Sequence, residues 1–439
     1  MGSSESITNV ADIILSHTVE KKSVVVSAMS GTTNQLIEAG KFATEGKISE
    51  AKEILKTIKF RHIETMNELV KKADLRKFSQ TFISSRINDL SEFLEAISII
   101  QEISPRSHDE IVSLGEVLSA HILTMHLRDR GTDTEFVSLE DIVPSHLTST
   151  GKEFFSEVKH ELFERVKHLL ERNAIPVCTG FFGKIPGGIV GAVGRGYSDF
   201  TAALIGSACN AEEIQIWTDV SGILSADPRI CSDAIVIPEL SFQEASELAN
   251  FGAKVIHPQT IWPAVKNNIP VRIKNTMKPN DAGTVITKDG RSSSAPFKSI
   301  TAKKEVTLLT LDHFESNESG VMAKVTGLLS EQNISIDLIS TSEASISFTL
   351  DYGEERIRNI QKKLEEICRI QTEKVAILSV VGEEMIESTG TVGKIFSALG
   401  DAGISIRMIS QGATEINISM IIEEEDVKKG ISAIHDAFF

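Results

Sequence analysis

The residues best suited to chemistry lie between Pro176 and Arg229. The run GRGYSD holds Arg195, Ser198 and Asp199 after a glycine-rich turn and directly before an apolar helical pattern. Unpaired backbone N–H groups and the positive end of the helix dipole attract anions at such a helix start. The arginine guanidinium adds paired donors whose geometry fits a carboxylate or a phosphate. The pattern indicates a site for a small anionic ligand, although a tight turn with a capped helix is the favoured explanation of this run alone.

Further polar residues are expected at the same edge of the predicted sheet. Thr218, Asp219, Asp227, Arg229 and Lys254 are predicted to follow consecutive strands. Ligands of open α/β sheets bind outside the carboxyl ends of the strands. The DPR run is also an ordinary turn signal, so a purely structural role for it stays open.

Two upstream residues are candidates for contact with a small polar substrate. Thr33 lies in the SGTTN loop after a short apolar run, and Glu116 follows Gly115 inside a helical pattern over 108–125. Glycine within a helix costs roughly 1 kcal/mol relative to alanine, which indicates close packing or ligand approach. A turn role for Thr33 and a solvated position for Glu116 are equally good interpretations.

Several function classes are excluded by what the sequence lacks. No GxGxxG fingerprint follows a predicted strand, which argues against a Rossmann dehydrogenase, and neither a Walker A motif nor the protein-kinase motifs occur. Any phosphoryl transfer must therefore rely on positioning, magnesium and local basic groups. The formal net charge of −16 argues against nucleic acid and anionic membranes as partners. The four cysteines lack metal-site spacing, so no metal site made of protein ligands is expected.

The elements that position these residues fall into an α/β pattern. An amphipathic helix opens the chain, with Ser6 or Thr8 as its expected cap, and Val24–Val26 reads as a short buried strand. Residues 35–100 are rich in helix signals. Strand and helix signals then alternate to about residue 276, which predicts a mostly parallel sheet with helices on both faces.

An internal repeat follows a polar linker candidate at 288–296. Residues 320–340 and 391–410 align with a shift of 70 positions, which pairs Lys324 with Lys394 and ISIDLIS with ISIRMIS. Each copy reads strand, helix, strand, strand, helix. The sequence thus predicts two copies of one small α+β module.

Taken in order, these motifs resemble those of aspartate kinases of the amino-acid kinase family. The matching runs are VVSAMSGTTN, SLGE, PVCTGFFG, GRGYSD, WTDVSGILSADPR, FGAKVIHP and VRIKNT, and the repeated tail resembles tandem ACT domains. The resemblance implies a kinase domain over 1–290 and ferredoxin-like ACT domains over 301–368 and 373–439. It implies transfer of the γ-phosphoryl group of ATP, with Mg²⁺, to the β-carboxylate of L-aspartate. That is the committed step toward lysine, threonine, methionine and isoleucine.

The resemblance also implies roles for individual residues. Arg195 and Asp199 would be catalytic, with Arg195 holding the α-carboxylate of aspartate and Glu116 its ammonium group. The remaining substrate contacts would be Thr33, Gly196 and Ser198. The nucleotide contacts would be Thr218, Asp219, Leu224, Arg229, Lys254 and Val255.

The tail implies regulation by an amino-acid effector, which would be lysine, threonine or both together. The effector contacts would be Val321, Met322, Ile336, Asp337, Ser342 and Glu343. ACT modules generally pair through their sheets, so a homodimer or larger homo-oligomer is expected.

The sequence departs from the family pattern at its start. The family opens with a strand ending in KFGG[TS]S, whose lysine neutralises the transferring phosphoryl group, whereas only Gly2, Ser3 and Ser4 match here. A misplaced start is the favoured explanation, and a catalytically silent amino-acid-binding regulator is the alternative. Tyr197 replaces the usual glycine of GRGGSD, and Leu224 replaces a frequent aromatic residue. No signal peptide or bilayer-spanning apolar run is visible, so a cytoplasmic protein is expected, with an upstream targeting peptide as the open alternative.

Overall fold

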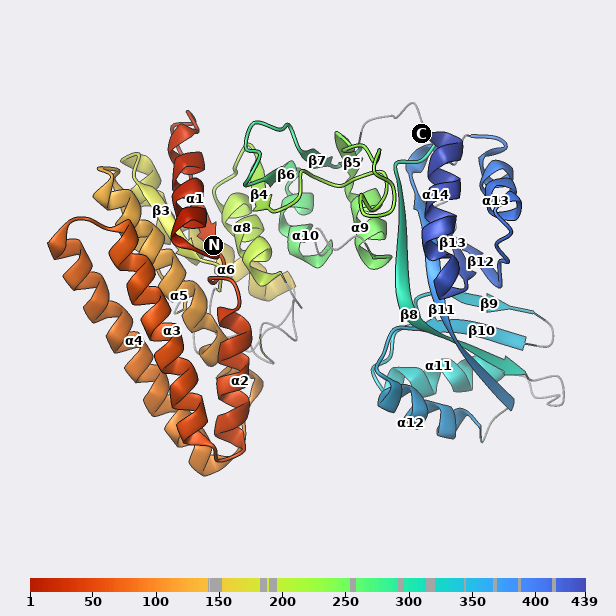
Figure 1. The fold of residues 1–439 in the computed structure, drawn as a ribbon, viewed down its shortest axis with the longest axis horizontal. Coiled ribbons are helices and arrows are strands. Elements are labelled where there is room, and N and C mark those ends of the chain that lie inside the picture. The colour runs from red at the N-terminus through yellow and green to blue at the C-terminus, as the bar shows by residue number, and fades with distance from the viewer. Residues whose placement is uncertain are drawn as a thin grey trace. The chain divides into compact units, whose positions relative to one another are not determined.

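The fold is that of a computed structural model in which the chain forms two compact units. One unit comprises Met1–Ser221 and Ile256–Lys288, and the other comprises Gly222–Val255 and Asp289–Phe439. Figure 1 shows both units along the chain. The structure describes residues 1–140, 142, 152–181, 188, 196–252, 258–290, 296–312, 320–342, 345–365, 369–385, 388–412 and 416–439. Segment 222–255 thus groups with the C-terminal part, and the domain bounds drawn from the sequence stay a prediction.

A parallel sheet lies at the centre of the first unit. Its strands run in the order β1 (Val24–Val26), β3 (Ile175–Thr179) and β2 (Thr134–Val137). Successive side chains of a strand point to opposite faces. Accordingly Val26 packs with the helices on one face, whereas Val25 packs with those on the other. The predicted strand at Val24–Val26 is confirmed, as is the mixed α/β fold with a parallel sheet.

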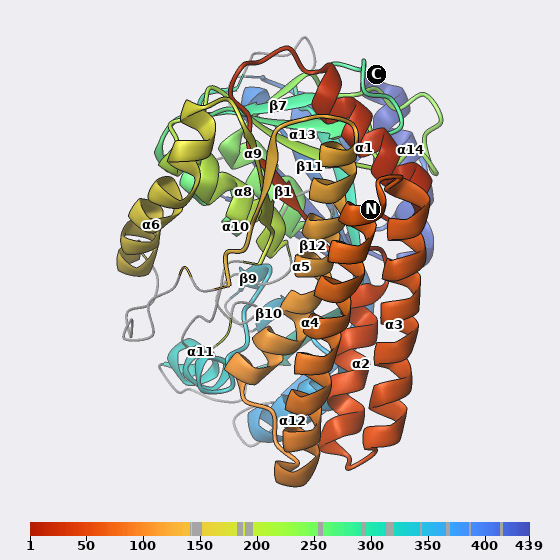
Figure 2. The same ribbon diagram turned by 90° about the vertical axis from the view of Figure 1, so that its left-hand side faces the viewer.

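Long helices cover one face of this sheet and form a bundle, whose members lie side by side in Figure 2. They are α1 (Ser4–Ser16), α2 (Thr32–Thr44), α3 (Ile48–Leu69), α4 (Ala73–Ile100) and α5 (Pro105–Asp129). The prediction of a helix-rich region over 35–100 is confirmed. The predicted cap of α1 at Ser6 or Thr8 is wrong, because the Ser3 hydroxyl accepts the Ser6 N–H and the helix begins earlier.

Helices α6 (Lys152–Glu171) and α8 (Tyr197–Ala208) cover the other face. Helix α8 also packs against α10 (Pro258–Lys266). Strand β4 (Ile214–Thr218) pairs in parallel with β6 (Val271–Asn275), which pairs antiparallel with β7 (Thr284–Thr287).

The second unit contains the predicted repeat. The first copy comprises β8 (Ser299–Asp312), α11 (Val321–Glu331), β9 (Ile339–Thr341), β10 (Ser345–Leu350) and α12 (Glu354–Leu364). The second comprises β11 (Arg369–Val381), α13 (Thr391–Asp401), β12 (Met408–Gln411), β13 (Asn417–Ile422) and α14 (Val427–Phe438). The predicted order of strand, helix, strand, strand, helix is therefore confirmed in both copies. All strands join one sheet in the order β12-β13-β11-β8-β10-β9.

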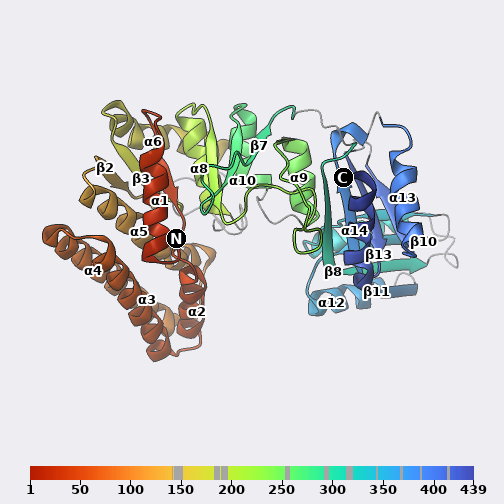
Figure 3. The ribbon, with the colours of Figure 1, turned by 45° about the horizontal axis from the view of Figure 1, so that its top comes forward.

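Strands β8 and β11 bind the two copies together. They pair antiparallel from Arg369–Asp312 at one end to Val381–Ser299 at the other. Strand β10 pairs with the second half of β8, and β13 pairs with the second half of β11. Each long strand therefore serves both modules, as Figures 1 and 3 show.

The segment 222–252 packs on the second module and also supplies β5 (Glu239–Ser241) and α9 (Phe242–Asn250). Its residues Ala226 and Cys231 share a hydrophobic core with α14. The buried Ser225 hydroxyl lies 3.0 Å from Nε2 of the equally buried His435 on that helix. These contacts pack the segment against the last helix of the second copy.

Candidate active site

A buried carboxyl group on α5 is the centre of the candidate site. Glu116 is only 2% exposed, so the interpretation as a solvated helix residue is wrong. The Ser198 hydroxyl, from the first turn of α8, donates to Glu116 Oε1 at 2.6 Å. The second oxygen, Oε2, has no hydrogen-bond partner within the part of the chain that the structure describes. A buried acceptor without a donor suits a ligand that brings a positive group.

Two glycines explain how the elements approach so closely. A Cβ atom on Gly180 would lie 2.7 Å from the Ser198 hydroxyl and 2.9 Å from Glu116 Oε2. A Cβ atom on Gly115 would lie 2.9 Å from the Cβ atom of Ala28, in the loop after β1. Real side chains do not tolerate such distances, so both positions need glycine. The expectation that Gly115 serves close packing is confirmed.

Burial changes the acid–base chemistry of the site. It raises the pKa of Glu116 to about 8, and the hydrogen bond from Ser198, together with the nearby backbone N–H groups of Phe181 and Ala28, opposes only part of that rise. Burial also raises the pKa of Asp199 to about 6. Carboxyl groups with strongly raised pKa values in one place are typical of functional sites. The site therefore favours a ligand that supplies positive charge to Glu116.

Helix α8 begins as the sequence indicates, but without a side-chain cap. Gly196 is the N-cap residue with a φ of 92°, a conformation suited to glycine, and neither Ser198 nor Asp199 caps the helix. The Asp199 N–H donates to the Gly196 carbonyl oxygen at 3.0 Å, so within the described chain the Tyr197 and Ser198 N–H groups are the ones left for another acceptor. Arg195 lies outside the described residues.

Thr33 and Tyr197 extend the site toward α2. Thr33 lies in the first turn of α2 rather than in the preceding loop. Burial raises the pKa of the Tyr197 hydroxyl above its usual range, and a hydrogen bond with Thr33 opposes this rise. The structure therefore brings together Thr33, Glu116, Gly196, Ser198 and Asp199 from three separate stretches. The sequence did not predict the close approach at Gly180 or the contact between Tyr197 and Thr33, because no motif at either position specifies its partner.

The predicted nucleotide residues divide between the two units. Thr218 ends β4, and its hydroxyl donates to Asp219 at 3.1 Å. Leu224 and Arg229 belong to the second unit, where Arg229 is highly exposed and pairs with Asp227 at 2.7 Å. Among the described residues no strand lies between β4 and β5, so the expectation that Asp227 and Arg229 follow a strand is wrong, and the alternative that DPR is a turn is confirmed. Lys254 and Val255 lie outside the described residues, so their roles stay predictions.

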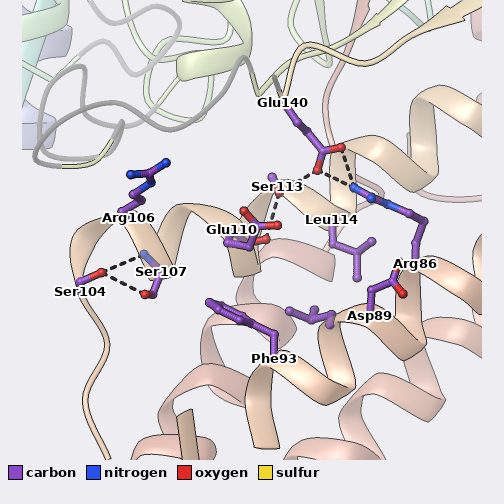
Figure 4. A pocket seen from close by; sticks show the side chains of 11 residues that line it. Arg86, Asp89, Phe93, Ser104, Arg106, Ser107, Glu110, Ser113, Leu114 and Glu140 are labelled. Carbon is purple, nitrogen blue, oxygen red and sulfur yellow. Dashed lines mark hydrogen bonds and ion pairs between the residues drawn. The ribbon is translucent and has the colours of Figure 1, made fainter. Parts of the chain in front are cut away.

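A cavity of about 440 Å³ lies on a different face of α5. Figure 4 shows Arg86 from α4 bound to Glu140, with both oxygens of Glu140 2.6 Å from one guanidinium nitrogen. Leu90 and Leu114 supply apolar lining. Glu116 does not line this cavity, so the cavity is separate from the buried carboxyl site.

The predicted effector residues meet in the first repeat module. Val321 and Met322 open α11 and pack with Ile336 in one hydrophobic cluster. The Asp337 carboxylate binds the Lys303 ammonium group, with both oxygens 3.1 Å from Nζ. Ser342 makes hydrogen bonds with Ser345, and Glu343 lies outside the described residues. Sequence reasoning missed Lys303, which lies well before the motif in the chain.

The fold is that of an amino-acid kinase joined to ACT modules. The family model "Amino acid kinase family" matches residues 1–275, and the family model "ACT domain" matches residues 316–355 and 378–438. Aspartokinase 1, chloroplastic, of Arabidopsis thaliana is 36% identical over all of this chain and 78% of its own length. The aspartokinase of Schizosaccharomyces pombe is 34% identical over 92% of this chain and 83% of its own length.

Solved structures agree with these relatives. E. coli aspartokinase III in complex with aspartate and ADP (R-state) matches with a TM-score of 0.81 and 29% identity, over 99% of this chain and 97% of that chain. The same enzyme in complex with lysine and aspartate (T-state) matches with a TM-score of 0.78. The chain belongs to the aspartokinase family. The prediction of a kinase is confirmed over that of a catalytically silent regulator.

Proposed function

We propose that the chain transfers the γ-phosphoryl group of ATP to the β-carboxylate of L-aspartate at the site around Glu116. This proposal rests mainly on the buried carboxyl group of Glu116, because one of its oxygens has no hydrogen-bond partner among the described residues. The ammonium group of aspartate would bind this oxygen, and Ser198 would hold the carboxyl in place from the other side. Arg195 would bind the α-carboxylate, as its sequence position indicates.

The N-terminus of α8 is proposed to stabilise the aspartate that accepts the phosphoryl group. Its first-turn N–H groups, beside Gly196, favour negative charge through the helix dipole. Asp199 would orient the reacting carboxylate from the same turn. Thr218 and Asp219 would contact the nucleotide at the end of β4, and Leu224, Arg229, Lys254 and Val255 are proposed to complete that contact.

Magnesium fits this site as a partner of the nucleotide. Among the described residues there is no group of three or more His, Cys, Asp or Glu side chains that could hold a metal ion. Mg²⁺ commonly binds through one or two carboxylates and the phosphates of its substrate. Asp199 and Asp219 are the residues proposed to face it, and the ion would neutralise charge on the transferring group.

Regulation is proposed to reside in the first ACT module. The effector's carboxylate would meet the N-terminus of α11, beside Val321 and Met322, and its ammonium group would meet Asp337. Ile336, Ser342 and Glu343 would shape the pocket around a lysine or threonine side chain. We also propose that the ACT sheets pair in a homodimer.

Among the described residues, none of the helices combines the length and the apolar character that crossing a membrane requires. A cytoplasmic location stays a prediction.

An acyl-phosphate assay tests the reaction. The protein is incubated with ATP, Mg²⁺ and either L-aspartate or L-glutamate, and the product is trapped as a hydroxamate. Hydroxamate from aspartate alone is expected, whereas hydroxamate from glutamate, or from neither substrate, contradicts the proposal. Ser198→Ala is expected to raise the KM for aspartate by about tenfold, because it removes a hydrogen bond to a charged group. Ser113→Ala, which removes a hydroxyl near the separate cavity, serves as the control.

A further inference from the structure

Lys303 already fills the position that an effector's ammonium group would need. Its Nζ lies 3.1 Å from each oxygen of Asp337 and 3.0 Å from the nearer oxygen of Asp351. The Lys303 and Asp337 side chains are only 19% and 22% exposed, whereas Asp351 is 54% exposed. The contact is therefore a partly buried ion pair centred on Asp337.

An incoming ammonium group would compete with this lysine. The lysine side chain ends in the same chemical group as a free amino acid carries on its α-carbon, and both donate to a carboxylate in the same way. Two ammonium groups on one carboxylate repel each other, and partial burial reduces the screening of that repulsion. Lys303 is tethered, so it binds Asp337 without the loss of translational freedom that a free ligand suffers.

Lys303 also lies on a strand that contacts the proposed nucleotide segment. Four residues earlier on β8, the Ser299 hydroxyl donates to the carbonyl oxygen of Leu224 at 2.7 Å. The Ile300 N–H donates to the carbonyl oxygen of Ser225 at 2.8 Å. At about 3.3 Å per residue, the strand joins these contacts to Lys303 over roughly 13 Å. The first residues of β8 thus contact the proposed nucleotide segment, and Lys303 on the same strand contacts the proposed effector site. Both contacts lie within the second unit.

We propose that Lys303 is an intramolecular competitor of the effector, which displaces it from Asp337 when it binds. Displacement of the lysine then changes the hydrogen bonds that β8 makes with Leu224 and Ser225. This change in turn alters nucleotide binding. This inference rests on the proposed effector site at Asp337. The rival account is a purely structural ion pair in which Lys303 orients Asp337 for its ligand.

The two accounts predict opposite effects of Lys303→Met. Binding of L-lysine and of L-threonine is measured by calorimetry on the whole protein at pH 8, without reference to activity. Competition predicts that Lys303→Met binds its effector about tenfold or more tightly, while maximal inhibition of the kinase decreases. Unchanged or weaker binding overturns the inference. Lys303→Arg retains the cation and is expected to bind the effector as the natural protein does.

Matched controls separate the possible failures. Lys304→Met removes the same charge from the exposed neighbouring residue and should leave effector affinity unchanged. Asp337→Asn should weaken effector binding about tenfold or more, whether or not Lys303 is present. Normal binding by Asp337→Asn would refute the proposed effector site itself, and so would a natural protein that binds neither amino acid. If Lys303→Met unfolds at a lower temperature, Lys303→Gln provides the same comparison with a polar side chain, and equal or weaker binding by both overturns competition.

Discussion

Each unit contains a buried or partly buried carboxyl group, and we assign an ammonium group as the ligand of both. The two carboxyl groups differ in the partners that the protein itself gives them. Glu116 in the kinase unit keeps one oxygen without a partner among the described residues, and burial raises its pKa to about 8. Asp337 in the ACT unit is already bound by Lys303, and burial raises its pKa against the opposing effect of that lysine. In the proposed function, the first carboxyl binds a substrate in every cycle. By our inference, the second binds its own lysine until an effector displaces it.

The two ACT copies extend this comparison. The shift of 70 positions that relates the copies places Glu373 opposite Lys303 and Arg407 opposite Asp337. Arg407 binds Glu373 at 2.7 Å, so both copies make the same ion pair with the charges exchanged. The second pair is about 45% exposed, more than twice as exposed as the first. At this paired position the first copy therefore has the more buried carboxylate, which favours an ammonium-binding effector site in the first copy.

The largest expected effect comes from removing the substrate carboxylate. Glu116→Gln keeps an acceptor for Ser198 but loses the charge that binds ammonium, so the KM for aspartate should rise about 30-fold or more. Initial-rate kinetics with trapped hydroxamate measure this. Glu140→Gln, which alters the separate cavity, is the matched control, and an equal rise in both variants would refute the role of Glu116.

A second effect should appear only in regulation. Asp337→Asn removes the charge for the effector's ammonium group, so the effector concentration for half inhibition should rise about tenfold or more. Asp337 is not proposed to contact aspartate, so the KM for aspartate serves as an internal reference. Arg407→Asn in the second copy should leave inhibition unchanged, and a comparable loss there would contradict the assignment of the effector site to the first copy.

The pH dependence of aspartate use should follow Glu116. This carboxyl must be ionised to bind ammonium, and its pKa in the free protein is raised to about 8. The kcat/KM for aspartate is therefore expected to increase about threefold between pH 7.5 and 8.5 and then level off. Rate profiles in overlapping buffers check this. The rise should vanish in Glu116→Gln, and a wild-type profile in that variant would be inconsistent with the account.

The smallest expected effect is on stability. A carboxyl whose folded pKa is raised from 4.5 to about 8 binds more protons in the folded state, so its ionisation destabilises the fold as pH rises through that window. Glu116→Gln cannot ionise and should unfold at a higher temperature than the natural protein at pH 8.5, but not at pH 5. Each kcal/mol corresponds to roughly 2–4 °C in a unit of this size. Thermal unfolding at both pH values measures this, and equal midpoints would contradict it.

Much of this architecture could be predicted from local sequence. The short strand at Val24–Val26 and the duplicated module carry clear periodic patterns, and the glycine in GRGYSD marks a backbone conformation that the structure contains. Burial of Glu116 could not be predicted, because it depends on Gly180 and Ser198, which are distant in the sequence.

The misplaced expectations have the same origin. The local pattern predicts a strand end at Asp227 and Arg229, but the turn that contains them packs with the ACT unit. Lys303 has no motif of its own, and its partner Asp337 lies 34 residues away. Contacts between segments distant in the sequence decide these positions, and local patterns carry no information about them.

Comparing aspartate with succinate tests the central claim most directly, because succinate lacks only the ammonium group. Binding of both compounds to the natural protein and to Glu116→Gln is measured by calorimetry at pH 8.5 with ADP and Mg²⁺. We expect the natural protein to bind aspartate much more tightly than succinate, and Glu116→Gln to lose most of that preference. If Glu116→Gln keeps the full preference for aspartate, another group binds the ammonium and the assignment of Glu116 is wrong.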